Sequence, residues 1–128
     1  MTQQVRLTNH VMSNKTRNTK EGAIVDDFFI TMFQGMAGEK FYFETIDQFT
    51  CFPGRFQVEI ILADASSGVV VDSKAFAIDS TIFGYVHGEK TEWYPNLMPG
   101  FYEYQIWVDG AQIAVFGFGC HLRTGIVS

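Results

Sequence analysis

The chain has 128 residues, of which 47% are hydrophobic, 16% aromatic and only 18% charged, and its formal net charge is −5. A chain of this length is typical of one domain and buries enough surface to hold a core without disulfide or metal support. The acidic balance argues against nucleic acid as the main partner, because neutralising phosphates requires a basic face. No apolar run reaches the ~18 residues that a membrane-spanning helix needs. The polar N-terminus has no signal-peptide pattern, so we expect synthesis in the cytoplasm.

The N-terminal part of the chain is predicted to be a strand followed by a polar arm. Residues 3–7 alternate weakly, as in a first edge strand. Residues 10–22 are rich in Asn, Ser, Thr and Lys, which is typical of a long loop or mobile arm. We therefore assign residues 1–22 to this strand and arm, residues 23–119 to a β-sandwich domain and residues 120–128 to a tail, all within a single domain.

A first core hairpin is predicted next. Residues 23–33 are apolar and rich in strand-forming residues, and glycines follow them. Residues 39–46 then alternate, which predicts that Phe43 faces inward and Glu44 outward. The two segments together read as a pair of antiparallel strands.

The clearest single strand covers residues 55–63, where apolar and polar residues alternate. Residues 64–68 form a turn cluster, and residues 69–78 read as the return strand, with a bulge near Ser73 where the alternation slips. Beyond this strand the pattern is irregular, and we predict a loop over residues 88–98.

The closing hairpin is the best-specified element of the sequence. Asp109-Gly110 lies between two alternating runs, which is a strong signal for a two-residue turn. Such a turn fixes the register, so that Tyr104 faces Val115 and Ile106 faces Ile113 on a core face. The predicted core comprises Phe28, Ile30, Phe43, Val58, Ile60, Tyr104, Ile106, Ile113 and Val115.

These elements predict the fold class. Seven or eight short strands, with turn signals every ~8–12 residues, indicate an all-β antiparallel sandwich of the immunoglobulin-like or jelly-roll type. Helical periodicity with capping residues is nearly absent.

The histidines and carboxylates form no recognisable catalytic or metal-binding pattern. Asp26-Asp27 is more typical of a charged strand boundary than of a metal pair, and His87-Gly88-Glu89 reads as a solvent-facing turn. No pair of carboxylates is singled out for glycoside hydrolysis. The sequence therefore predicts no catalytic residue, no cofactor, no metal and no enzymatic activity. The histidines, none of them in a recognisable motif, are His10, His87 and His121.

Two smaller features have simple interpretations. Cys51 and Cys120 are expected to be reduced and mostly buried, since the chain shows no secretion signal. The only basic cluster consists of Lys15, Arg17 and Lys20, and we interpret it as a solvated loop rather than an anion site.

Four aromatic residues remain as candidates for a binding surface: Trp93, Tyr94, Trp107 and Phe116. An exposed flat ring can stack on a sugar or anchor a protein partner. The alternative is that the rings cover the edge of the core, and this reading is favoured for Trp107 and Phe116. For Trp93 and Tyr94, beside a proline, the two readings are balanced.

The closing hairpin resembles that of small immunoglobulin-like modules on bacteriophage tails and baseplates. Residues 55–68 also look like a core strand and turn in the N-terminal domain of baseplate upper proteins. The likeness implies a non-catalytic assembly module that docks onto other virion proteins, as a homo-oligomer or in a particle, and it transfers no site residues. The rival hypothesis is a carbohydrate-binding module whose stacking platform is Trp93, Tyr94 and Trp107. The residues that carry the resemblance of the hairpin are Gly100, Tyr102, Tyr104, Ile106, Val108, Asp109-Gly110, Ile113, Phe116 and Phe118.

Overall fold

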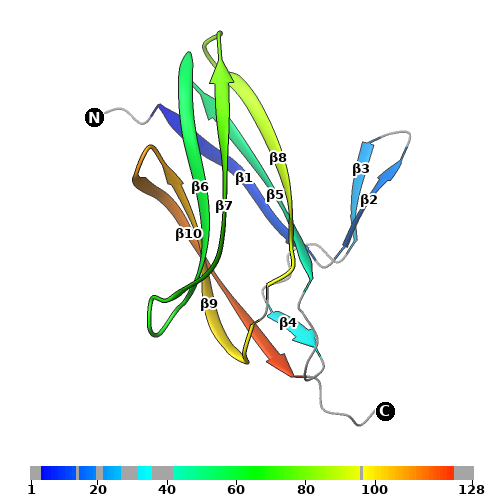
Figure 1. Cartoon of the computed structure of the whole chain (residues 1–128). Coiled ribbons are helices and arrows are strands. Elements are labelled where there is room, and N and C mark those ends of the chain that lie inside the picture. Colours follow the sequence, from blue (N-terminus) through cyan, green and yellow to red (C-terminus); the bar gives the residue numbers. More distant parts are fainter. Residues whose placement is uncertain are drawn as a thin grey trace.

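The protein is described by a computed structural model in which every regular element among the described residues is a β-strand (Figure 1). The structure describes residues 4–13, 15–19, 22–26, 32–35, 42–95 and 97–122. The strands are β1 (Val5–Ser13), β2 (Lys15–Thr19), β3 (Gly22–Asp26), β4 (Met32–Gly35), β5 (Phe43–Cys51), β6 (Gly54–Asp64), β7 (Val70–Ser80), β8 (Tyr85–Trp93), β9 (Gly100–Val108) and β10 (Ala111–Leu122).

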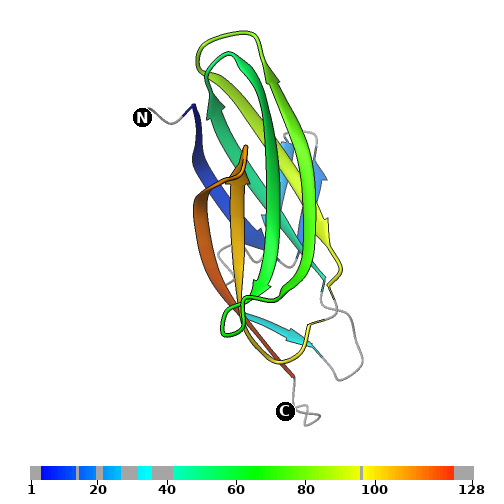
Figure 2. The same ribbon diagram turned by 60° about the vertical axis from the view of Figure 1, so that its left-hand side comes forward.

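Two sheets face each other as a sandwich, which confirms the predicted fold class (Figures 1 and 2). One sheet has three strands in the order β1-β5-β8, and the other has five in the order β4-β10-β9-β6-β7. Neighbouring strands are antiparallel except β4, which runs parallel to β10. β2 and β3 form a separate two-stranded sheet.

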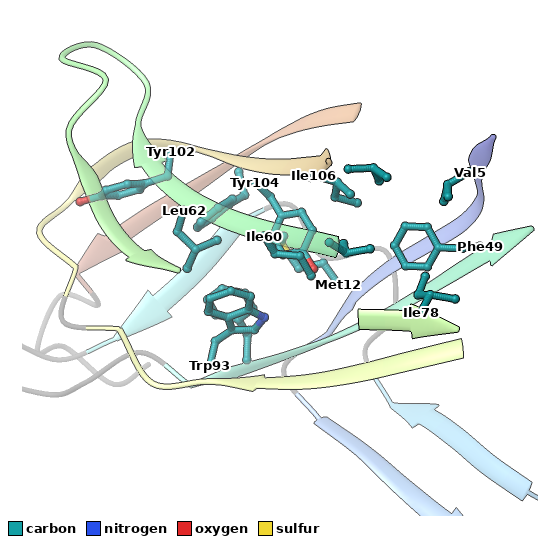
Figure 3. Packing of buried hydrophobic residues seen from close by; sticks show 14 of the residues in the cluster. Val5, Met12, Phe49, Ile60, Leu62, Ile78, Trp93, Tyr102, Tyr104 and Ile106 are labelled. Carbon is teal, nitrogen blue, oxygen red and sulfur yellow. The ribbon is translucent and has the colours of Figure 1, made fainter. Parts of the chain in front are cut away.

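The core fills the layer between the two sheets. Figure 3 shows buried side chains from both sheets pointing into this layer, with Ile60 and Leu62 of β6 above Trp93 of β8. The alternation along β6 is as predicted, because every second side chain from Phe56 to Leu62 is buried. Five of the predicted core residues are buried: Phe43, Val58, Ile60, Tyr104 and Ile106. Phe28 and Ile30 lie outside the described residues.

The register of the closing hairpin differs from the predicted one. The Asp109-Gly110 turn is present, with Asp109 at a φ of 49° and in the left-handed region. A bulge at Ile113 then shifts the pairing by one residue, so that Phe116 rather than Val115 lies opposite Tyr104. Each later side chain of β10 therefore changes face. Val115 is 46% exposed, so its assignment to the core was wrong, whereas Ile113 packs against the core in part.

The bulge has a clear energetic reason. Without it, Val115 and Gly117 would face inward; with it, the inward positions go to Phe116 and Phe118. Two phenyl rings bury far more apolar surface than one isopropyl group and a glycine. The core therefore selects the shifted register.

Other predictions for the chain need correction. The described residues of the predicted arm are strands, since β1 continues to Ser13 and β2 follows. The predicted loop over residues 88–98 was wrong up to Trp93, because β8 pairs continuously with β5. Glu44 was predicted to face solvent but is buried, with Lys90 Nζ 3.6 Å from its carboxylate. The register shift of β7 lies at Val71, not near Ser73.

The turn between β6 and β7 forms as predicted, and its first residue explains why. The Asp64 carboxylate accepts hydrogen bonds from the Ser66 hydroxyl and from the backbone N–H groups of Ser66 and Ser67. The bond from the Ser66 hydroxyl, followed by the backbone bonds, lowers the pKa of Asp64 to about 2. This turn also joins β9, because Ala65 N–H donates to Phe101 O at 3.0 Å.

Candidate functional site

A buried polar network joins the two sheets at the centre of the sandwich. Asp47, on β5, has a side chain with 0% exposure. Its Oδ2 accepts the hydroxyl proton of Tyr104 on β9 at 2.5 Å. Tyr104 Oη also lies 3.0 Å from Thr45 Oγ1, which accepts the indole N–H of Trp93 at 3.0 Å. Polar groups of three strands thus hydrogen bond to one another.

His10 of β1 completes the network at the side of the sandwich where β1 lies near β10. Its Nδ1 lies 2.5 Å from Asp47 Oδ1, and its ring stacks on Phe116 with a centroid distance of 4.1 Å and an interplanar angle of 11°. The ring of Tyr104 lies 4.8 Å away. His10 is 9% exposed, so the imidazole also closes this side of the core.

The electrostatics of the network favour a protonated Tyr104. Burial raises the pKa of Tyr104 well above its ordinary value, and the negative charge of Asp47 raises it further. A hydroxyl that keeps its proton remains a donor to the carboxylate at every ordinary pH.

The His–Asp pair resembles the part of a catalytic triad in which a carboxylate orients a base. Asp47 is the one hydrogen-bond partner of His10 among residues that the structure describes. No group of three His, Cys, Asp or Glu side chains gathers as a metal site in that same part of the chain. The contacts that are present join β1, β5 and β9.

Of the four predicted aromatic candidates, one is a core residue and a second packs against the core in part. Trp93 is 0% exposed and stacks on Phe43 at an interplanar angle of 14°. Lys74 of β7 covers the Trp93 ring, with its ammonium group 5.5 Å from the ring centroid. Phe116 is partly buried against His10. Trp93 is therefore not free to stack on a ligand.

Tyr94 is on the surface at the end of β8. It is exposed and contacts Tyr42 at a centroid distance of 4.9 Å. The Tyr42 hydroxyl donates to Glu44, and burial, this bond and nearby acidic charge raise the pKa of Tyr42. Tyr94 therefore lies beside Tyr42, close to the carboxylates of Glu44 and Glu92.

An open groove of about 480 Å³ lies between the edges of the two sheets. One wall is the middle of β7 and the other is the second half of β8, and each of these strands is one of the two edges of its sheet. The groove residues are Lys74, Ala75, Phe76, Glu89, Lys90, Thr91, Glu92 and Tyr94.

Trp107 lies on the outer face of the five-stranded sheet, where it is half-buried. Its indole N–H donates to Gln105 Oε1 at 3.0 Å, and the Gln105 amide donates to Glu103 Oε1 at 3.1 Å. Because these residues are two apart on β9, the indole extends along the strand toward Gln105. The Trp107 ring, the Gln105 amide and the Glu103 carboxylate thus form a row along β9.

An apolar patch lies at one end of the same face. We define the end patch as Ala65, Val69, Val70 and Phe101, and the large side chains among them are more than half exposed, Phe101 reaching 69%. Beside Phe101 is a hollow of about 360 Å³, also lined by Gly117 and Gly119. A Cβ atom built on Gly117 meets nothing within 4 Å, so this glycine leaves space at the surface.

The cysteines are free and buried, as predicted. Burial raises the pKa of both thiols, to about 12 for Cys120. Thiols with raised pKa values are poor nucleophiles. The described part of the chain also contains no helix that is long and apolar enough to cross a membrane.

Sequence reasoning missed the central network, although part of its signal was present. His10 falls in the predicted arm and Asp47 just beyond the predicted strand over residues 39–46, so neither residue was expected to face inward. Had β5 been extended through Asp47, the alternation Phe43, Thr45, Asp47, Phe49 would have placed a carboxylate inside. A buried carboxylate requires partners.

Comparison with known proteins adds no functional assignment. No protein-family model matches the sequence, and no curated protein matches it either. Function is therefore inferred from the end patch and the row on β9.

Proposed function

We propose that this chain is a non-catalytic structural module that works by binding other proteins within a larger assembly. The observation that carries the proposal is the end patch, with Phe101 exposed beside a hollow. Exposed apolar side chains, here with Phe101 and Ala65 lining a hollow, are typical of protein-binding surfaces. The resemblance to phage tail and baseplate modules suggests a virion as the setting.

We further propose that the sandwich is of the immunoglobulin-like type, and its strand order supports this. Immunoglobulin domains pair strands A, B and E in one sheet and C, F and G in the other. With β2–β4 set aside, β1, β5 and β8 occupy the positions of A, B and E, and β6, β9 and β10 those of C, F and G. β7 then corresponds to the extra strand beside C in variable-type domains.

Hydrogen bonds made by two tyrosines of β9 also support the immunoglobulin-like type. Tyr102, near the start of β9, donates its hydroxyl proton to Met98 O at 2.5 Å, which is the geometry of a tyrosine corner. In antibody domains the residue two positions later is the cysteine of the inter-sheet disulfide. Here that residue is Tyr104, which hydrogen bonds to Asp47 of β5. A hydrogen bond thus takes the position of the covalent link.

The assembly proposal is tested by the mass of the protein in solution. Wild type should exceed the 14.5 kDa of the monomer, increasingly so at higher concentration. Gly117→Glu puts a charge into the hollow at a site with free space for a side chain, so it should lower the mass without unfolding the chain. The matched control is Ile82→Glu, at an exposed apolar residue outside the end patch. Equal effects of the two variants would argue against the end patch.

A second candidate function, carbohydrate binding, is favoured by the row on β9. Saccharide sites combine an aromatic face with polar side chains that hydrogen bond to hydroxyl groups, and Trp107, Gln105 and Glu103 supply both. The platform that the sequence predicted cannot form, because Trp93 is inside the core. Glycan binding at this face would shift tryptophan fluorescence, and Trp107→Ala would abolish the shift. A glycan response that survives Trp107→Ala would exclude this site.

A further inference from the structure

Two turns at one end of the sandwich bring apolar side chains together at the surface. The turn between β7 and β8 contains Ile82 and Phe83, which are 61% and 75% exposed. The turn between β5 and β6 contains Phe52 and Pro53, and the ring centroids of Phe52 and Phe83 lie 4.7 Å apart. We name these four residues the apolar tip. Figures 1 and 2 both show the two turns at the end of the sandwich opposite the β6–β7 turn, so the apolar tip is separate from the end patch.

The backbone around the apolar tip is hydrogen-bonded within the chain at several points. Three bonds run from the Ser80 hydroxyl to Ile82 O at 2.9 Å, from Gly84 N–H to Cys51 O at 3.1 Å and from Phe52 N–H to Gln4 O at 2.9 Å. Pro53 has no N–H group to satisfy. A backbone polar group is costly to move into an apolar medium unless it already has a hydrogen-bond partner. These bonds therefore lower the cost of transferring the apolar tip out of water.

The charged residues at this end are mostly basic, although the chain as a whole has a net charge of −5. Among the last two residues of each sandwich strand that ends here, the charged ones are Arg6, Arg55 and Asp79. Both arginines are exposed and each is followed or preceded by a buried residue, so they lie on the outer faces of the two different sheets. Asp79 lies 3.8 Å from Arg55, but their side chains are 67% and 74% exposed, so this ion pair is weak. The apolar tip thus has an arginine on either side.

We propose that the apolar tip inserts into the surface of an anionic lipid bilayer. The apolar side chains of the two turns would enter the boundary between headgroups and acyl chains, and Arg6 and Arg55 would reach the headgroup phosphates. Such peripheral binding grows with the apolar area buried and with electrostatic attraction to anionic lipid. A lipid surface also needs no complementary pocket, which suits side chains that project from turns. This inference goes beyond the proposed assembly function.

Vesicle co-sedimentation of the full chain tests the proposal. The probes are vesicles of phosphatidylcholine alone and vesicles of equal parts phosphatidylcholine and phosphatidylglycerol. Wild type should bind the mixed vesicles more tightly. Phe83→Ser should weaken this binding by at least about tenfold, because the burial of one phenyl ring is lost. The matched control is Met98→Ser, since Met98 is also 75% exposed but lies at the other end of the sandwich, and it should leave binding unchanged.

A second pair of substitutions tests the electrostatic part. Arg6→Glu with Arg55→Glu should weaken binding to the mixed vesicles by at least about tenfold, because attraction to the anionic headgroups becomes repulsion. Binding to phosphatidylcholine alone should change little. An equal loss on both kinds of vesicle would overturn the preference for anionic lipid. Circular dichroism verifies that every variant is folded.

The outcomes separate lipid binding from contact with a protein. Wild type that binds neither kind of vesicle overturns the proposal, and so does vesicle binding that Phe83→Ser leaves unchanged. If Phe83→Ser instead lowers the mass of the protein in solution, the apolar tip is a contact between copies and the lipid proposal is overturned. With lipid as the occupant, Phe83→Ser has the same mass in solution as wild type, so assembly through the end patch is judged separately.

Discussion

Tyr104 of β9 and Asp47 of β5 join the two sheets by one hydrogen bond of 2.5 Å. Asp47 is fully buried and also meets His10 of β1. A buried carboxylate is tolerated only when its oxygens are satisfied, so the stability of the sandwich depends on this pair.

Tyr104→Phe should lower the free energy of unfolding by about 1.5–3 kcal/mol, because a hydrogen bond to a buried charged group is lost and Asp47 Oδ2 is left without that donor. Asp47→Asn should destabilise the chain as well, and the double variant should cost less than the sum of the two. Urea denaturation measures the change. Tyr85→Phe is the control, since this partly buried tyrosine has no hydroxyl hydrogen bond in the described structure. Equal effects at the two tyrosines would contradict the assigned role.

Stability should also fall at alkaline pH. The folded chain holds the pKa of Tyr104 well above its ordinary value, so the tyrosine ionises more easily in the unfolded chain. Its contribution to stability is therefore complete below pH ~10 and is lost as the pH rises above that value. Urea denaturation across this range should show a steeper decline for wild type than for Tyr104→Phe. Parallel curves would indicate that Tyr104 titrates normally.

The shifted register of β10 can be tested by a pair of substitutions. Replacing a fully buried Phe by Ala costs about 3–5 kcal/mol of stability. Phe116 is partly buried, so Phe116→Ala should cost somewhat less than this. Val115→Ser, on the exposed face, should change stability by less than about 1 kcal/mol. Thermal unfolding compares the two. A larger loss of stability for Val115→Ser than for Phe116→Ala would indicate the register expected without a bulge.

Ile106 provides a reference for the core. Ile106→Ala should cost about 2–5 kcal/mol, since its side chain is fully buried between the sheets and truncation leaves a cavity. A loss below about 1 kcal/mol would be typical of a surface position and would contradict the face assignment of β9.

The elements that depend on residues close in sequence were predicted correctly. The alternation along β6, the turn that Asp64 begins and the Asp109-Gly110 turn are all in the structure. Each depends on residues within a few positions of one another, through side-chain period or turn chemistry. These elements were enough to predict the fold class.

Features that depend on the opposite sheet could not be predicted in the same way. The bulge at Ile113 exists because Phe116 and Phe118 fill the core better than Val115 and Gly117, and this comparison requires the facing sheet. The pairing of Asp47 with Tyr104, 57 residues apart, depends on how the two sheets are stacked. Of the aromatic candidates, Trp93 was the least predictable, because its segment reads as a loop until β5 pairs with it.

The mass of the intact chain in solution tests the assembly proposal most directly. Sedimentation velocity over a range of concentrations should show species larger than the 14.5 kDa monomer, with their proportion rising with concentration. A single 14.5 kDa species at every concentration, with tryptophan fluorescence that responds to glycans and loses the response in Trp107→Ala, would contradict assembly and favour the carbohydrate-binding alternative.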